Sequence, residues 1–459
     1  MIDQNIIEAA HKACEADRAK RDGDQQVSQQ EKVFSKIKRH IIPIAILGLF
    51  VAFIDRTNLS VAGHSMSDSL SLSPAAFGLA AGLFYLGYIL TEVPSNIALR
   101  RYGARRWIAR IMISWGAITM LTLFVNTAES LYLARFLLGI AEAGFYPGIL
   151  FWMSFWLPSR SLTRAYSLFQ LGIPISLALG SLVTAQLLRM DGLAGIHGWQ
   201  WVFLIEGGAA VVMGLFTLKY MANTPAEAKW LSDEEKRILA EALAQDSAAV
   251  HETESGHSTA LREIFSSGAA WAYSACYLFM MIGFWTVTYW LPQILQDRLQ
   301  VDTVQAGVLS AVPWVISGLS LLVVSKRIEK GASLERAMVG VLFFCAIGFV
   351  LSSLAASATV AFIGLCMAAC IQAAVPLLFS FPSRHFDGAR AAVALAMVNS
   401  VGSLGGFIGP VLLGWMKGAT GSNQAGLLAM AGAFVIAGVI AVFLPKILRA
   451  AKAEASAQI

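Results

Sequence analysis

The chain has 459 residues, of which 57% are hydrophobic and only 14% are charged, and its formal net charge is +5. These proportions exclude an ordinary soluble domain, in which about a quarter of the residues are charged. The positive charge does not indicate nucleic-acid binding, because the basic residues gather in alternate connections between long apolar segments.

Long apolar segments recur from Ile41 to Leu444, and about twelve of them reach the length that a membrane-spanning helix needs. The first 40 residues are polar and hold no apolar signal core, so we expect the first span to be retained. By the positive-inside rule, the basic connections place both termini in the cytoplasm. These basic residues include Lys36, Lys38, Arg39, Arg100, Arg101, Arg105, Arg106, Lys326, Arg327 and Lys330.

A long polar stretch separates two sets of spans. The sequence therefore predicts an all-α integral membrane protein with twelve transmembrane helices in two six-helix halves. We expect a cytoplasmic tail at 1–40, a six-helix bundle at 41–222, a cytoplasmic central loop at 223–267, a second six-helix bundle at 268–447 and a C-terminal tail at 448–459.

The first two spans carry polar residues at membrane depth. Asp55 lies about 15 residues into the first span, past the middle of a hydrocarbon core of about 30 Å. Arg56 follows it, and adjacent side chains diverge by about 100° around a helix. In the second span, Tyr85 and Tyr88 share a face with Glu92. The alternative for Asp55 and Arg56 is an interfacial pair at a ragged helix end.

The fourth span, from Leu131 to Arg160, carries two charged residues. Arg135 and Glu142 are seven positions apart, close to two helical turns, so they lie on one face. A charge at the centre of a membrane helix costs about 2.5–3.5 kcal/mol on insertion scales. Two charges on one face indicate a polar interior, with a structural ion pair to a neighbouring helix as the alternative.

The later spans add polar and aromatic residues. Gln170 lies in the fifth span, Tyr277 and Trp285 lie in the seventh, and Asn399 lies near the middle of the eleventh. An isolated Asn at this depth either contacts a substrate or bonds one helix to another. The aromatic residues are able to cover an aromatic acid or to stack on a sugar acid.

The cysteines of the spans, Cys276, Cys345, Cys366 and Cys370, form neither a disulfide framework nor a metal-binding spacing. No nucleophile–base cluster appears among the spans either. We therefore predict that the protein is not an enzyme and binds no metal or cofactor.

Several motifs resemble the anion:cation symporter family of the major facilitator superfamily over nearly the whole chain. They are D-R-T-N at 55–58, P-S-N-I-A-L at 94–99, G-A-R-R-W at 103–107, R-F-L-L-G-I-A-E-A-G-F-Y-P-G at 135–148, G-W-Q-W-V-F-L-I-E-G at 198–207, K-W-L-S-D-E-E at 229–235 and N-S-V-G-S-L-G-G-F-I-G-P at 399–410. Two of them, G-W-Q-W and K-W-L-S, are similar to the bacterial branch that includes phthalate, tartrate and 4-hydroxyphenylacetate permeases.

This resemblance implies the major facilitator fold, a bacterial inner membrane location and proton-coupled uptake of organic anions. It also implies roles by position. Asp55 and Glu142 match proton-carrying acids, and the arginines and the other polar residues match substrate or gate contacts: Arg56, Arg135, Tyr88, Asn399, Tyr277 and Gln170. Gln170 is displaced by about one helical turn from the polar residue of some relatives. The acids that the family has after the second and eighth spans are replaced by Arg100 and Lys326.

Charge counting supports symport. Asp55, Arg56, Arg135 and Glu142 sum to zero when all are ionised, so a bound carboxylate leaves one negative charge uncompensated. Protonation of either acid restores neutrality, so the anion and a proton should bind together. We expect Arg56 to be the principal carboxylate ligand, with Tyr88 beside it.

We expect a monomer in the lipid bilayer whose partners are protons and a small organic anion, not a nucleic acid. The alternative function is a proton-driven drug or metabolite antiporter, or an exporter, of the same fold. Two arginines in the pocket disfavour a cationic substrate. A nutrient sensor is a weaker alternative, because the central loop is too short for an obvious signalling domain.

Overall fold

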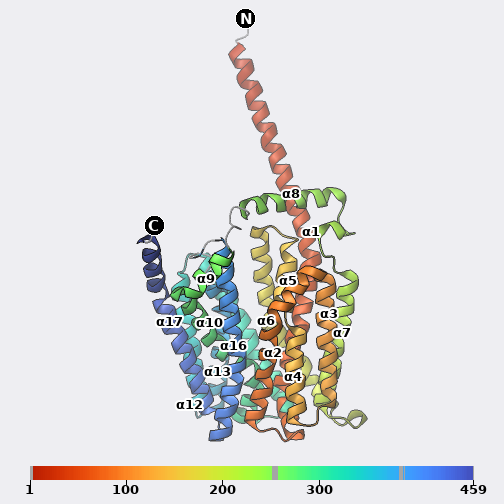
Figure 1. Ribbon diagram of the computed structural model, residues 1–459, viewed down its shortest axis with the longest axis vertical. Helices are drawn as coiled ribbons and strands as arrows, with labels where there is room; N and C mark the ends of the chain where they lie inside the picture. The colour runs from red at the N-terminus through yellow and green to blue at the C-terminus, as the bar shows by residue number, and fades with distance from the viewer. Residues whose placement is uncertain (1–3, 251–256, 382–385, 387, 458–459) are drawn as a thin grey trace.

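The computed structural model describes residues 4–250, 257–381, 386 and 388–457. Every regular element within these residues is a helix (Figure 1). Twelve helical segments among them are long and apolar enough to cross a membrane. The predictions of an all-α chain and of twelve spans are therefore confirmed. Parts of the predicted central loop and C-terminal tail, at 251–256 and 458–459, lie outside the described residues.

The first half contains seven helices because its fourth span is broken into two. They are α1 (Gln4–Ser69), α2 (Pro74–Tyr102), α3 (Ala104–Leu121), α4 (Ala128–Glu142), α5 (Phe145–Ser154), α6 (Ser159–Leu187) and α7 (Gly198–Tyr220). Short 3-10 turns follow α3 and α6.

The connection and the second half are also built from helices. The connection holds α8 (Asp233–Val250) and α9 (His257–Ser266). The second half consists of α10 (Gly268–Leu299), α11 (Thr303–Glu329), α12 (Leu334–Leu354), α13 (Ala358–Ala369), the 3-10 turn η6 (Cys370–Ala373), α14 (Val375–Phe379), α16 (Gly388–Thr420) and α17 (Gln424–Ala457).

The fourth and tenth spans are both interrupted. The fourth consists of α4 and α5, and the tenth consists of α13, η6 and α14. These two spans hold the same position within their six-span halves. Interrupted helices at matching places support an origin of the two halves by duplication.

Local sequence signals explain where several helices begin. The Ser73 hydroxyl accepts from the Ala76 amide at 3.1 Å before Pro74 opens α2. Thr127 and Ser130 form a reciprocal capping box at the start of α4. Such caps satisfy amide groups that have no partner within their own helix.

Both termini lie at one end of the bundle, which we call the terminal end (Figure 1). The positive-inside rule predicts that this end faces the cytoplasm. Helix α8 crosses it and is tied to α1, because Lys36 Nζ lies 2.7 Å from Glu235 Oε2. Just before α8, the Trp230 ring stacks on the His40 ring of α1 at 4.1 Å. The Lys36 hydrogen bond, together with the Ser232 amide, holds the pKa of Glu235 below its usual value.

The two halves are in close contact at the opposite end. A Cβ atom on Gly78 of α2 would lie 2.5 Å from the Pro410 carbonyl oxygen and 3.2 Å from Gly414 Cα of α16. Likewise, a Cβ atom on Gly307 of α11 would lie 2.8 Å from Ala185 Cβ of α6. Small residues allow these helix backbones to approach one another. The two halves are therefore packed against each other at the end away from the termini.

Candidate functional site

An ion pair joins the first and fourth spans at the centre of the molecule. Arg56 Nη1 of α1 lies 2.8 Å from Glu142 Oε1 of α4, and both side chains are buried. The same nitrogen donates to the Ala52 carbonyl oxygen at 2.5 Å. The sequence placed Glu142 on one helix face with Arg135, but seven residues rise about 10 Å along a helix. Glu142 therefore pairs with the arginine of the neighbouring helix.

Aromatic rings surround the Arg56 guanidinium. Its central carbon lies 4.9 Å from the ring centroid of Phe53, 5.1 Å from that of Phe84 and 5.6 Å from that of Trp285. Cations are stabilised by aromatic faces at such distances. Phe53 and Phe84 come from the first half, whereas Trp285 belongs to α10 of the second. The ion pair therefore lies at the interface between the halves.

Arg135 lies beside this ion pair and is almost completely buried, at 1% exposure. Its Nη2 donates to the Tyr289 hydroxyl of α10 at 3.3 Å, and its central carbon lies 5.1 Å from the Phe84 ring centroid. Its Nε and Nη1 atoms are buried without an acceptor among the described residues. A buried cation with unpaired donors is costly for a protein to keep. These donors are suited to a carboxylate ligand.

Asp55 points away from Arg56, as the divergence of adjacent side chains predicted. Its Oδ1 accepts from the Thr119 hydroxyl of α3 at 2.7 Å and from Asn58 Nδ2 at 3.1 Å. Its Oδ2 has no partner among the described residues. Asp55 is 3% exposed, so the interfacial pair considered for Asp55 and Arg56 does not describe this residue.

The other predicted site residues form a second polar group. Asn399 Nδ2 of α16 donates to Glu92 Oε1 of α2 at 3.4 Å, which bonds the two halves. The Tyr146 hydroxyl of α5 donates to Gln170 Oε1 of α6 at 2.5 Å. Tyr277 of α10 lies close enough to Tyr146 and to Glu92 to interact electrostatically with both.

Tyr88 of α2 connects the two groups. It lies within electrostatic range of Glu92 and Tyr146 of one group and of Arg56 and Glu142 of the other. Its ring centroid is 6.1 Å from that of Phe84. All eight predicted site residues therefore lie in two linked groups. The side-chain oxygen of Gln170 already accepts a hydrogen bond from Tyr146.

The break in the fourth span lies directly after Glu142. Gly144 adopts a left-handed conformation with φ +86°, and a Cβ atom on it would lie 2.4 Å from Ser95 Oγ. The Ser95 hydroxyl donates to the Ala143 carbonyl oxygen at 2.6 Å and accepts from Trp107 Nε1 at 3.0 Å. Helices α2 and α3 thus stabilise the break and orient the end of α4 that carries Glu142.

Replacement of Gly144 with Ala should therefore impair transport and lower the melting temperature of the purified protein. The left-handed backbone costs a residue with a Cβ about 1–2 kcal/mol, and the Ser95 hydroxyl would have to move as well. The control is Gly340→Ala in α12, where a Cβ would meet nothing within 4 Å. Equal melting temperatures and transport rates for the two variants would contradict this role of Gly144.

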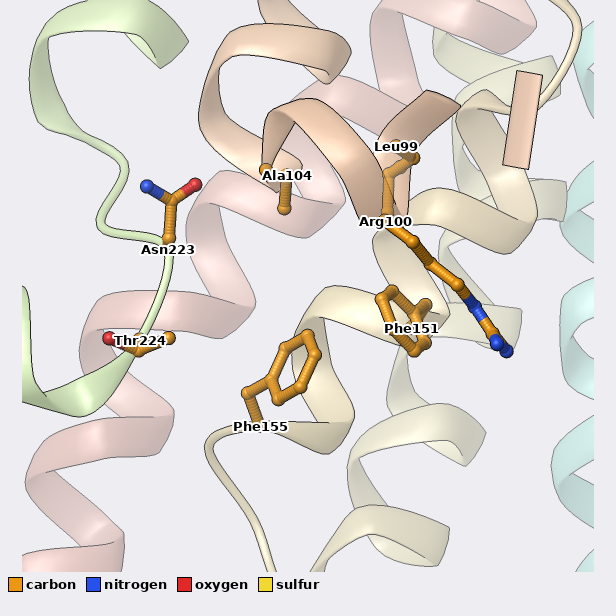
Figure 2. A pocket seen from close by; sticks show the side chains of 8 residues that line it. Leu99, Arg100, Ala104, Phe151, Phe155, Asn223 and Thr224 are labelled. Carbon is orange, nitrogen blue, oxygen red and sulfur yellow. The ribbon is translucent and has the colours of Figure 1, made fainter. Parts of the chain in front are cut away.

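A separate cavity of about 490 Å³ lies at the terminal end of the first half (Figure 2). Its lining residues are Leu99, Arg100, Gly103, Ala104, Phe151, Phe155, Asn223 and Thr224. Arg100 runs beside the Phe151 ring, 5.2 Å from its centroid (Figure 2). The cavity is lined by the first half and by the start of the connection that follows it, so it is not the interface that holds the central charges.

Sequence reasoning missed two contributors to the central site. Thr119 gave no signal, because a lone hydroxyl in an apolar span usually bonds its own helix. Glu206 of α7 is a buried carboxylate that accepts from the Thr184 hydroxyl at 2.8 Å. The sequence does show Glu206 as an acid eight residues into the otherwise apolar sixth span. No group of three His, Cys, Asp or Glu side chains that could hold a metal occurs within the described residues.

Twelve spanning helices in two halves, with buried charges between the halves, define a membrane transporter. The family model described as the Major Facilitator Superfamily matches residues 45–410. The chain belongs to this superfamily. It therefore falls among transporters, not enzymes.

Two relatives and one solved structure illustrate the similarity. A "Putative tartrate transporter" of Agrobacterium vitis is 36% identical over 91% of this chain and 95% of its own length. A "Quinolone resistance transporter" of Acinetobacter baumannii is 34% identical over 87% of this chain and 91% of its own length. A bacterial homologue of the human lysosomal transporter Spinster, in an inward-facing conformation, matches with a TM-score of 0.70 at 19% identity, over 91% of this chain and 97% of that one.

Proposed function

We propose that this transporter takes up a small organic anion together with protons, by alternating access across the bacterial inner membrane. The substrate is an aromatic, hydroxy or sugar carboxylate. The observation that carries the proposal is the buried Arg135 guanidinium, whose Nε and Nη1 donors have no acceptor among the described residues. The relative named as a putative tartrate transporter agrees with a hydroxy acid.

The sequence suggests Arg56 as the principal carboxylate ligand, but Arg56 is already paired with Glu142, so this proposal gives the first carboxylate contact to Arg135. The Arg56–Glu142 ion pair supplies the coupling step. A carboxylate bound at Arg135 would add a negative charge to a site in which Arg56 is already neutralised by Glu142. A proton on Glu142 offsets that charge and weakens the ion pair between Glu142 and Arg56. The Arg56 guanidinium then becomes able to donate hydrogen bonds to the same carboxylate. Asp55 is the second proton-coupling acid, while Tyr88, Asn399, Tyr277 and Gln170 contact the rest of the substrate.

The transport cycle exposes this site to each side of the membrane in turn. The glycine contacts of α2 with α16 close the end opposite the termini, and rocking of the two halves would open that end and close the terminal end. All the proposed site residues belong to one chain, and we propose that the monomer is the transporting unit.

The test is a counterflow screen in proteoliposomes that contain the purified protein. Aromatic, hydroxy and sugar acids, with tartrate among them, are offered under an imposed pH gradient. An inward proton gradient should drive accumulation of the carried acid, and a protonophore should abolish accumulation while leaving counterflow intact. Accumulation that persists without the proton gradient and follows sodium instead would contradict proton symport.

A proton-driven antiporter is the second candidate, and the relative named as a quinolone resistance transporter favours it. The two functions differ in the direction of proton flow. Under symport, addition of substrate outside should acidify the vesicle lumen, whereas under antiport it should make the lumen more alkaline. A pH-sensitive dye trapped inside the vesicles distinguishes the two outcomes, with a quinolone and an organic acid tested side by side.

A further inference from the structure

The Tyr85 hydroxyl of α2 is a buried polar group that the proposed binding site does not use. Tyr85 is only 4% exposed. Its hydroxyl has no hydrogen-bond partner among the described residues. The hydroxyl interacts electrostatically with Arg56 and Tyr289, but neither side chain lies in hydrogen-bonding geometry with it. An unpaired buried hydroxyl is costly, so its presence at this place indicates a ligand.

Two aromatic rings place Tyr85 beside the arginines of the site. The Tyr85 ring centroid lies 5.0 Å from that of Phe84 and 4.7 Å from that of Trp285. The Phe84 centroid is 5.1 Å from the central guanidinium carbon of Arg56 and also 5.1 Å from that of Arg135. The Trp285 centroid is 5.6 Å from the central carbon of Arg56. Tyr85 therefore shares its aromatic neighbours with both guanidinium groups.

Tyr85 also contacts the second half of the protein. Its ring centroid lies 6.3 Å from that of Tyr289 of α10, whose hydroxyl accepts from Arg135 Nη2 at 3.3 Å. A Cβ atom on Gly406 of α16 would lie 2.5 Å from the Tyr85 ring, so this glycine allows the ring to pack against α16. Tyr85 therefore lies at the same interface between the halves as Arg135.

The free donors at this interface match one carboxylate group. Arg135 Nε and Nη1 have no acceptor among the described residues, and the Tyr85 hydroxyl is able to donate as well. An ionised carboxylate only accepts hydrogen bonds and offers about four lone-pair sites. It can therefore accept from Arg135 and from Tyr85 together. An ammonium group has no acceptor and satisfies none of these donors.

We propose that the Tyr85 hydroxyl donates a hydrogen bond to the substrate carboxylate held by Arg135, which makes Tyr85 a further specificity-determining residue of the transporter. This inference rests on the proposed transport of an organic anion. Tyr85 selects for the carboxylate end of the substrate, while Tyr88 and Asn399 contact the rest of it. A neutral donor adds no charge, so the coupling between the anion and protons does not depend on Tyr85.

Replacement of Tyr85 with Phe removes the hydroxyl and keeps the ring. The melting temperature of the purified variant should equal or exceed that of wild type, because the hydroxyl has no partner among the described residues in the absence of substrate. Affinity for the transported acid should fall about 10-fold or more, as expected for loss of a hydrogen bond to a charged group. The control is Tyr102→Phe at the exposed end of the same helix, which should change neither quantity.

Dissociation constants are measured by isothermal titration of the purified full-length protein with benzoate, tartrate and gluconate, one acid for each class in the proposed function. The acid that wild type binds most tightly is then titrated into both variants. Uptake of the same acid into proteoliposomes should show a higher KM in Tyr85→Phe and should still be driven by the proton gradient.

The results that would overturn this inference differ from those that would overturn the proposed function. Equal affinities of wild type and Tyr85→Phe would remove Tyr85 from the binding site, even if the acid is carried with protons. A melting temperature several degrees lower in Tyr85→Phe would show that the hydroxyl has a structural partner, and the inference would fail on that ground. If wild type binds none of the three acids, the proposed function fails and this inference fails with it.

Discussion

The Arg135→Lys variant should bind the transported acid about 10- to 150-fold more weakly than wild type. Lysine keeps the positive charge but loses the planar pair of donors that fits a carboxylate. A hydrogen bond to a charged group contributes about 1.5–3 kcal/mol, which corresponds to that range of affinity. The effect should be large because Arg135 is buried and its Nε and Nη1 donors have no acceptor among the described residues.

Dissociation constants from isothermal titration of the purified variants test this expectation. The matched control is Arg110→Lys, because Arg110 also stacks on an aromatic ring, 4.0 Å from the Trp107 centroid, but lies exposed outside the site. Arg56→Lys should weaken binding as well, and it should also lower stability because it disturbs the pair with Glu142. An Arg135→Lys protein that folds normally and binds with unchanged affinity would leave Arg135 with a structural role only.

Much of the fold could be predicted from apolar length alone. A membrane span must satisfy its backbone within itself, so each long apolar segment had to be a helix. The convergence of Asp55, Arg56, Arg135 and Glu142 was also predictable, because ionisable side chains inside a membrane avoid lipid. The burial of all four residues and the Arg56–Glu142 distance of 2.8 Å agree with this expectation.

The pairing inside the site could not be predicted in the same way. Helix periodicity places Arg135 and Glu142 on one face, but it does not show which helix lies opposite, so it does not predict that Glu142 pairs with Arg56. The break at Gly144 had a visible signal in the Gly and Pro residues that follow Glu142. The break itself depends on Ser95 and Trp107, which belong to other helices and meet Ala143 only in the folded protein.

The count of charges changes once burial is known. Asp55, Arg56, Arg135 and Glu142 sum to zero when all four are ionised. Glu92, already visible in the sequence beside Tyr88, and Glu206 are both buried as well, and with all six groups ionised the set becomes negative. Under the proposed symport, an anion that enters this site should therefore bring protons with it, since buried negative charge without compensation is costly.

Replacement of Glu142 with Gln should abolish uphill accumulation while preserving substrate binding and exchange. Gln has the shape of the protonated acid, so the site remains permanently in its loaded form and cannot release a proton. Exchange of labelled for unlabelled substrate requires no net proton movement and should continue. The substitution leaves the Arg56 charge in place, where the Ala52 carbonyl and the rings of Phe53 and Phe84 still stabilise it.

The competing explanation is a purely structural ion pair, and it predicts a different result. Removal of one partner of a buried pair typically costs about 3–5 kcal/mol, so a structural Glu142 would give a poorly folded protein that neither binds nor exchanges. Binding, exchange, pH-driven uptake and melting temperature are therefore measured on the same preparation. Glu129→Gln, an exposed acid at the start of the same helix, is the control and should match wild type in all four. Retained pH-driven accumulation in a folded Glu142→Gln protein would exclude Glu142 as a proton carrier and leave that role to Asp55.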